Sequence, residues 1–165
     1  MTISIKTYLG VDPGLGGALA FFTPSTGCLR LVDTPVEWVK VNGKRRRQLD
    51  KLYLHYAVCE LDVECAILEA VHSMPGQGVA SSFSFGGVFH ATEQCLICNG
   101  IEPHLVQPRT WKKFFGLSAD KDEARALAMK KFPKYAHLFE RKKDDGRAES
   151  ALLALYAFLW TVHAS

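Results

Sequence analysis

The sequence predicts an α/β fold with a mixed five-stranded sheet, three antiparallel strands followed by two parallel ones, flanked by helices. Three short apolar runs open the chain, and turn residues separate them as in β-hairpins. Farther along, helical apolar spacing alternates with two more short apolar runs, which is typical of parallel crossovers. The 165 residues contain no internal repeat and no long linker, so we expect a single domain over residues 1–165.

Each element in the first half has its own signal. The first three strands are apolar runs joined by turns rich in Pro, Gly and Ser; they are expected at residues 3–11, 17–22 and 28–32. Apolar residues at three- and four-residue spacing between Leu49 and Ala57 predict a helix. The apolar run 65–69 then predicts a buried strand.

The second half of the chain is expected to be mostly helical. A helix over residues 78–99 ends at an Asn-Gly pair, which is a C-cap signal, and a short strand follows at 104–106. Two more helices complete the chain, one over about 118–132 and one from about residue 146 to the end.

Charge and composition exclude several classes of protein. The net charge of +3 is too small to indicate a nucleic-acid partner by itself, but the cations are clustered at residues 40–51 and 141–143. The longest strongly apolar run, 151–162, is shorter than the roughly 18 residues of a membrane span. Without a secretory signal, we expect a cytoplasmic, organellar or viral-replication compartment. The five cysteines lack paired spacing and are expected to be reduced.

Two carboxylates end predicted strands. Asp12 closes the first apolar run and is followed by Pro-Gly-Leu-Gly-Gly, and Glu69 closes the run 65–69. A carboxylate at the end of a buried strand is costly to desolvate unless it is paired or binds a metal ion. The alternative is that each side chain faces solvent beside a turn.

A second pair of acids opens the last predicted helix. Asp145 and Glu149 are four residues apart, which places both side chains on one helical face. The alternative is helix capping, because acids favour the N-terminus of a helix. A capping box would require Glu or Gln three residues after the cap, and neither Asp144 nor Asp145 has one.

The strand-end acids and the helical pair converge only if the last helix lies across the strand ends. That arrangement predicts a metal site. Oxygen-only ligation suits Mg²⁺ or Mn²⁺, and two ions ~4 Å apart can hold the attacking water and the leaving oxygen in phosphodiester hydrolysis. The sequence offers no comparable Ser/His/Asp or Cys/His set.

Three ordered segments contain these acids. They are Y-L-G-V-D-P-G-L-G-G-A-L-A-F around Asp12, A-I-L-E-A-V-H-S-M-P-G-Q-G-V around Glu69, and K-K-D-D-G-R-A-E-S-A-L-L-A at the last helix. As a set they resemble the RuvC-like Holliday-junction resolvases of the RNase H-like superfamily. The resemblance covers residues 8–160, and the four-residue spacing of the helical acids is closer to phage-type and organellar members than to the main bacterial branch. It implies an RNase H-like fold.

The resemblance also implies a reaction and the residues that perform it. Asp12, Glu69, Asp145 and Glu149 correspond to the catalytic acids and metal ligands, for two Mg²⁺ ions per active site with Mn²⁺ as a substitute. The last position is usually Asp in the family, so the side chain of Glu149 is one methylene longer, and Asp144 is an alternative ligand. The implied enzyme is a structure-selective endodeoxyribonuclease, a homodimer that nicks four-way DNA junctions symmetrically without a nucleotide cofactor or a membrane.

Basic and aromatic residues are expected to contact the junction DNA. The run Arg45-Arg46-Arg47 is expected in a loop, where the alternative is a solvated charge run. The resemblance implies a further contact, because in the bacterial branch of the family an aromatic residue three positions after the strand acid is implicated in opening the junction. The matching position here is His72, and Phe83 and Phe85 are further candidates or core residues. The remaining contacts are expected at basic residues after the fifth strand, at the start of the next helix and just before the last helix: Arg109, Lys112, Lys113, Lys121, Lys142 and Lys143.

The helix over 78–99 carries small residues that suit close approach in a dimer, and the alternative is ordinary packing on the sheet.

Other functions compete with this interpretation. Actin-like ATPases and sugar kinases also begin with a strand, an aspartate and a Gly-rich turn, but they need two such domains to enclose a nucleotide. Other RNase H-like nucleases, acting on branched DNA or RNA/DNA hybrids, share the carboxylate chemistry. An inactive junction-binding protein would lack one of the acids, and none is missing.

Overall fold

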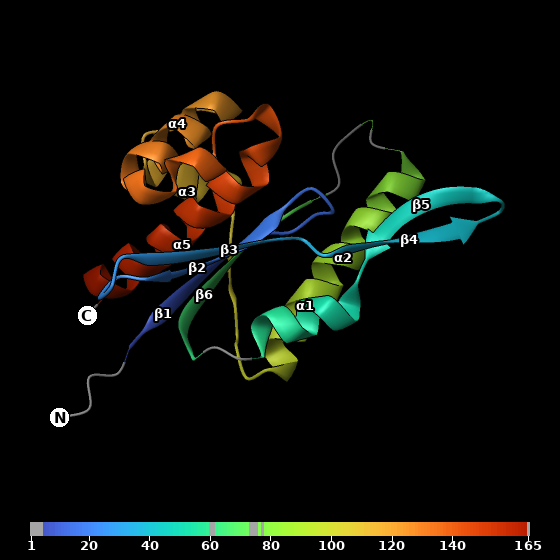
Figure 1. Cartoon of the computed structure of the whole chain (residues 1–165), viewed down its shortest axis with the longest axis horizontal. Coiled ribbons are helices and arrows are strands. Elements are labelled where there is room, and N and C mark those ends of the chain that lie inside the picture. The colour runs from blue at the N-terminus through green and yellow to red at the C-terminus, as the bar shows by residue number, and fades with distance from the viewer. Residues whose placement is uncertain (1–4, 60–61, 73–75, 77, 165) are drawn as a thin grey trace.

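A mixed sheet with helices on both faces forms the centre of the molecule (Figure 1). The computed structural model describes residues 5–59, 62–72, 76 and 78–164. The strands of the main sheet are β1 (Thr7–Asp12), β2 (Ala18–Thr23), β3 (Cys28–Asp33), β6 (Val63–Glu69) and β7 (His104–Val106). They follow the order β3-β2-β1-β6-β7; the first three pair antiparallel, and β6 and β7 are added as parallel strands. The predicted five-stranded mixed sheet is confirmed.

Two helical layers cover this sheet. The helices α3 (Pro108–Phe114), α4 (Lys121–Lys131) and α5 (Asp145–Ala164) lie on one face, and α1 (Lys51–Val58) and α2 (Val79–Cys98) lie on the other (Figure 1). Two short 3-10 helices, η1 (Pro133–Leu138) and η2 (Lys142–Asp144), connect α4 to α5. Because side chains alternate along a strand, Tyr8 of β1 packs in the α5 layer, whereas its neighbour Leu9 packs with α1 and α2.

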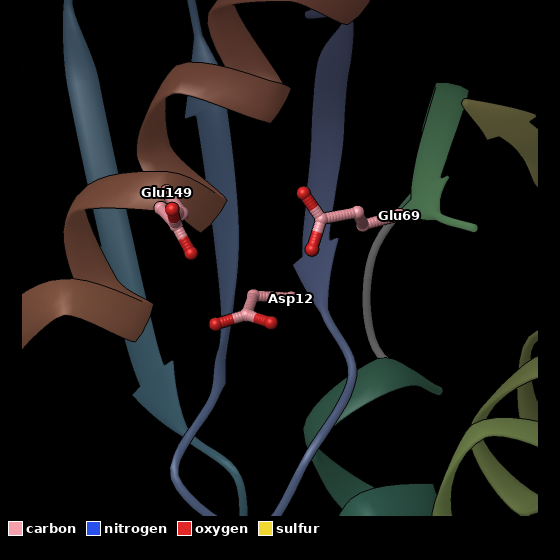
Figure 2. Close-up of side chains that lie close together, drawn as sticks. All are labelled: Asp12, Glu69 and Glu149. Atoms are coloured by element: carbon pink, nitrogen blue, oxygen red, sulfur yellow. The ribbon is translucent and has the colours of Figure 1, made fainter. Parts of the chain in front are cut away.

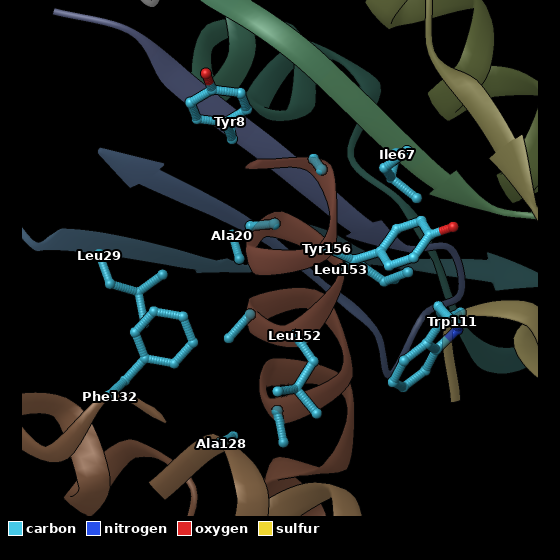
Figure 3. Close-up of a cluster of buried hydrophobic side chains, with 14 of the residues drawn as sticks. Tyr8, Ala20, Leu29, Ile67, Trp111, Ala128, Phe132, Leu152, Leu153 and Tyr156 are labelled. Carbon is cyan, nitrogen blue, oxygen red and sulfur yellow. The ribbon is translucent and has the colours of Figure 1, made fainter. Parts of the chain in front are cut away.

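The helix α5 packs closely against β1. Its buried side chains Leu152 and Leu153 lie in one core cluster with residues of the sheet and of α3 (Figure 3). Only glycine fits at position 10 of β1, since a Cβ there would lie 2.2 Å from the carbonyl oxygen of Ser150 and 2.2 Å from the amide nitrogen of Ala154. This backbone contact sets the position of α5 over the sheet, and with it the position of the first turn of α5.

A separate hairpin, formed by β4 (Val36–Val41) and β5 (Lys44–Leu49), extends away from the main sheet beyond α2 (Figure 1). Asn42 and Gly43 form its two-residue turn with φ values of 50° and 75°. Asn-Gly suits such a turn because both central residues adopt positive φ. The expectation of a loop around Arg45–Arg47 was therefore wrong: these residues belong to β5.

Two features of the helices go beyond the predictions. The predicted helix α1 is confirmed; it buries Leu54, Ala57 and Val58 and leaves Leu52, Tyr53 and Tyr56 exposed. The short helix α3 was not predicted at all. In the part of the chain that the structure describes, no helix combines the length and apolar character required to span a bilayer.

Candidate active site

Three carboxylates meet at one edge of the sheet. Asp12 ends β1, Glu69 ends the neighbouring parallel strand β6, and Glu149 lies one turn into α5. One carboxylate oxygen from each lies within 4.8 Å of the other two, and the three side chains point toward one another (Figure 2). Among the described residues, no other cluster of three His, Cys, Asp or Glu side chains is close enough to share a metal ion. The two strand-end acids therefore converge with one of the two predicted helical acids, Glu149.

A glycine brings the start of α5 against the turn that follows Asp12. A Cβ at Gly146 would lie 2.5 Å from the carbonyl oxygen of Gly16 and 3.1 Å from Oδ2 of Asp12. Any larger residue would push the first turn of α5 away from the acids. Gly146 thus makes it possible for Glu149, which follows it by three residues, to reach Asp12 and Glu69.

Burial and the neighbouring acids destabilise the charged forms of Asp12 and Glu69. Burial, followed by the charges of Glu149 and Glu69, raises the pKa of Asp12 from its ordinary 3.8 to about 8. Burial also raises the pKa of Glu69, against a hydrogen bond from Trp111 that lowers it. Glu69 and Glu149 are each only 7% exposed, so water screens the repulsion weakly. A divalent cation would relieve this repulsion, and the all-oxygen donor set fits Mg²⁺ or Mn²⁺.

Two side chains of α3 hold the acids in place. The indole Nε1 of the fully buried Trp111 donates a hydrogen bond of 2.8 Å to Oε1 of Glu69. Lys112 Nζ lies 2.8 Å from Oε1 of Glu149, and this ion pair is largely shielded from solvent. Trp111 was not among the predicted site residues. Pro108, two residues after the strand 104–106, is a helix-start signal that would have placed Trp111 and Lys112 on one short helix.

The other two acids of the predicted set lie outside the cluster. Asp145 forms ion pairs with Lys121, at 3.4 Å, and with Arg125, at 3.2 Å, both on α4. Asp144 is buried, and its carboxylate accepts hydrogen bonds from the backbone nitrogen and the guanidinium of Arg141. That guanidinium holds the pKa of Asp144 below its usual range. Asp144 therefore stabilises the start of η2 and does not face the three converging acids.

The predicted DNA contacts lie around α3, at the start of α4, on η2 and on β5. The contact predicted at the start of α4 is Lys121, which forms the ion pair with Asp145 described above. Arg109, Lys112 and Lys113 line a cavity of about 550 Å³ along α3. Exposed His72 accepts a hydrogen bond of 2.7 Å from Gln107, the residue before α3. The exposed residues Lys142 and Lys143 belong to η2, and the three arginines of the hairpin belong to β5.

The two phenylalanines considered for opening the junction differ in their surroundings. Phe83 is 85% exposed on α2. Phe85 is partly buried, and its ring lies 3.3 Å from the position that a Cβ at Gly14 would take. Phe83 is thus free to contact a partner, and Phe85 packs against the turn that follows Asp12.

Comparison with known proteins identifies the fold. No family model and no curated protein matches the chain. Solved structures do match: Thermus thermophilus RuvC in complex with a Holliday junction substrate has a TM-score of 0.60 at 14% identity and covers 97% of each chain. A second structure of Thermus thermophilus RuvC has a TM-score of 0.58 at 14% identity and covers 96% of each chain. The fowlpox virus Holliday junction resolvase has a TM-score of 0.47 at 12% identity, over 93% of this chain and 97% of that one.

The likeness extends over almost the whole chain, and at this level of identity it concerns the fold. The strand order, the long helix on β1 and the acids at the sheet edge agree with the resemblance seen in the three sequence segments. This chain has the RuvC form of the RNase H-like fold.

Proposed function

We propose that the chain is a metal-dependent, structure-selective endodeoxyribonuclease that resolves four-way DNA junctions. The observation that carries the proposal is the convergence of Asp12, Glu69 and Glu149 at the sheet edge of a RuvC fold. Of the two Thermus thermophilus structures, one is described as bound to a Holliday junction substrate. Three buried or partly buried acids with one lysine beside them favour a divalent cation, and phosphodiester hydrolysis is a reaction that such a site can serve.

Asp12, Glu69 and Glu149 are the proposed ligands of Mg²⁺ or Mn²⁺, with two ions per site. Bound there, the ions would activate a water molecule and neutralise charge on the phosphate. Asp145 is the proposed fourth ligand, since it lies one helical turn before Glu149 on the same helix. Its present partners, Lys121 and Arg125, are cations, so a metal ion would compete with them for the same carboxylate.

Residues of the chain prepare this site. Trp111 fixes the carboxylate of Glu69 through its hydrogen bond, as partners of metal ligands commonly do. Lys112 pairs with Glu149, and its ammonium group would be available to the phosphate when that carboxylate binds a metal ion. The neighbouring cations Arg109 and Lys113 would then bind the DNA backbone along α3.

A homodimer is the proposed active form, because symmetric nicks require one active site for each of two opposed strands. The exposed apolar residues of the two helices on one face of the sheet support this. Val79 is 87% exposed and Phe83 is 85% exposed on α2, and α1 presents Leu52, Tyr53 and Tyr56 to solvent. Soluble monomers rarely leave large apolar patches uncovered.

Cleavage of labelled substrates tests the proposal. The protein is incubated with Mg²⁺ and an immobile four-way junction, a duplex of the same sequence, or an RNA/DNA hybrid, with the Asp12→Asn variant as the blank. We expect paired nicks at symmetric positions in opposed strands of the junction, little cutting of the duplex, and no cutting by the variant. Preferential cutting of the hybrid would assign the site to another RNase H-like nuclease, and cutting of none would contradict the nuclease assignment.

A further inference from the structure

A basic cavity lies beside the turn that follows Asp12. Its volume is about 360 Å³, and its lining comes from that turn, the end of β3, the base of the hairpin, η2 and the start of α5. Its charged residues are four cations and two carboxylates: Arg47, Arg141, Lys143, Arg147, Asp33 and Asp144. The cavity therefore has an excess of two positive charges.

Both carboxylates are already neutralised within the protein. Arg147 donates two hydrogen bonds of 2.6 Å to Asp33, and Arg141 donates to both oxygens of Asp144. Arg47 donates to the carbonyl oxygen of Leu15 at 2.9 Å, a neutral acceptor, so its charge is left for an outside anion. Arginine forks that keep free N–H groups are well suited to phosphate oxygens.

The pairing of the hairpin continues this basic surface outward. Residues directly opposite each other in an antiparallel pair share a face. Trp38 lies opposite Arg47, and Lys40 lies opposite Arg45, so these four residues share the face that reaches the cavity. The Arg45 guanidinium lies 5.0 Å over the ring of Trp38, which is 58% exposed.

The opposite face of the hairpin lies beside a different cavity. Val39 lies opposite Arg46, and Val41 lies opposite Lys44, which places these four residues on the other side. Arg46 lines a different cavity, together with Ser81, Ser84 and Phe85 of α2. The three consecutive arginines of β5 therefore do not form one contact surface.

We propose that the cavity and the first face of the hairpin form a binding track for the sugar–phosphate backbone of one DNA strand beside the scissile phosphate. The track consists of Trp38, Lys40, Arg45, Arg47, Arg141, Lys143 and Arg147. The assignment of DNA as the ligand rests on the proposed function. The phosphate nearest the acids sits in the cavity, and the exposed ring of Trp38 stacks on an unpaired base farther out.

The position of the track supports a role next to the cut. Gly16 and Gly17 line the cavity, and both also contact the start of α5 at Gly146, beside Asp12. Along the hairpin, side chains on one face repeat every two residues, about 6.8 Å apart, a spacing similar to that of successive phosphates in a strand. A strand lying on this face would thus meet a cation at each step toward the acids.

Two double variants with equal loss of charge test the track. Lys40→Ala/Arg45→Ala removes two cations from the proposed face, and Lys44→Ala/Arg46→Ala removes two from the opposite face. All four side chains are exposed, so we expect both variants to be folded and to have the same Tm as the parent in thermal melts. The dissociation constant of each is measured over a salt series with the four-way junction and with the matched duplex.

We expect the first variant to lower the slope of log affinity against log salt by about 1.8, which corresponds to two lost phosphate contacts, and the second by less than about 0.5. An equal decrease of the slope in both variants would overturn the track, because it would show only a general effect of charge. A larger decrease in the second variant, or no decrease in either, would also overturn it. Failure of the proposed function appears separately, as parent protein that cuts no junction. The comparison of the two faces can then still be made on duplex DNA, and parent protein that binds no DNA at all would also overturn the track.

Discussion

The environment of Asp12 strongly disfavours its negative charge. It ends a buried strand, and both neighbouring acids contribute to a pKa of about 8. A carboxyl group with a raised pKa binds its proton more tightly in the folded than in the unfolded chain. The free energy of unfolding therefore decreases as the pH rises from about 4, the ordinary pKa, to about 8.

Thermal unfolding at several pH values checks this. In the presence of chelator, we expect the Tm of the parent to decrease between pH 6 and pH 8.5, because Asp12 loses its proton among other acids. Asp12→Asn should show a weaker decrease and a higher Tm than the parent at pH 8.5. Added Mg²⁺ should raise the parent's Tm at pH 8.5 more than that of the variant. A variant with the same pH dependence as the parent would contradict the repulsion among the three acids.

Trp111 provides a second test at the scale of single residues. Trp111→Phe keeps most of the buried volume and removes the hydrogen bond to Glu69. Loss of such a partner typically weakens metal binding about 10–100-fold, so the Mg²⁺ concentration for half-maximal cleavage should rise by that factor. Activity at saturating Mg²⁺ should largely recover. An unchanged Mg²⁺ requirement in a folded variant would show that the indole fills space and does not position Glu69.

At the scale of elements, the packing of α5 on β1 determines whether the site exists. Gly10→Ala would place a methyl group against backbone atoms of α5, which cannot move aside as a side chain can. We expect a loss of stability of about 1–3 kcal/mol and a loss of cleavage even where the protein folds, because Glu149 moves with α5. Gly16→Ala is the matched control for stability, since nothing lies within 4 Å of its added Cβ. Equal unfolding midpoints for both variants in urea would contradict this account.

The elements that could be predicted are those with a local signal of their own. β1, β2, β3 and β6 are apolar runs ending at turns, and α4 has a capping aspartate and a proline after its end. The hairpin was missed because β5 is almost entirely charged and lacks the apolar pattern of a strand. The signal that could have predicted the hairpin is the Asn-Gly pair, which forms the turn between two strands of equal length. The exposed face of α1 could not be inferred, since apolar residues lie on both its buried and its exposed sides.

The candidate site was predictable to a similar extent. Strand-end acids and acids on the last helix are visible in the sequence, and their convergence follows from parallel pairing of β1 and β6. The directions in which the acidic side chains at the start of α5 point could not be predicted from the sequence. Asp145 is held by Lys121 and Arg125, and Asp144 by Arg141, and these long-range or capping contacts depend on how η2 and α4 are packed.

At the scale of the whole molecule, paired cutting requires two copies of the chain. We expect the protein to have the mass of a dimer in light scattering and Phe83→Glu to shift it toward monomer, because the change places a charge in the exposed apolar surface of α2. On a supercoiled plasmid that extrudes a cruciform, the parent should give linear DNA and the variant should give nicked circles. Ala126→Glu, at an exposed position of α4 on the other face of the sheet, is the control with the same added charge. A variant that stays dimeric and yields linear DNA would exclude this surface of α2 as the interface.

Asp12, Glu69 and Glu149 are proposed to hold the metal ions on which cleavage of a DNA junction depends. Binding and cleavage of one labelled junction are measured in parallel for the parent and for Asp12→Asn, Glu69→Gln and Glu149→Gln, with Mg²⁺, with Ca²⁺ and with chelator. We expect the parent to cut only with Mg²⁺, because the looser coordination of Ca²⁺ positions the attacking water poorly. Each variant should bind the junction about as tightly as the parent and cut it at less than about one hundredth of the rate. Near-normal cutting by any of the three variants, or cutting by the parent in chelator, would contradict the claim.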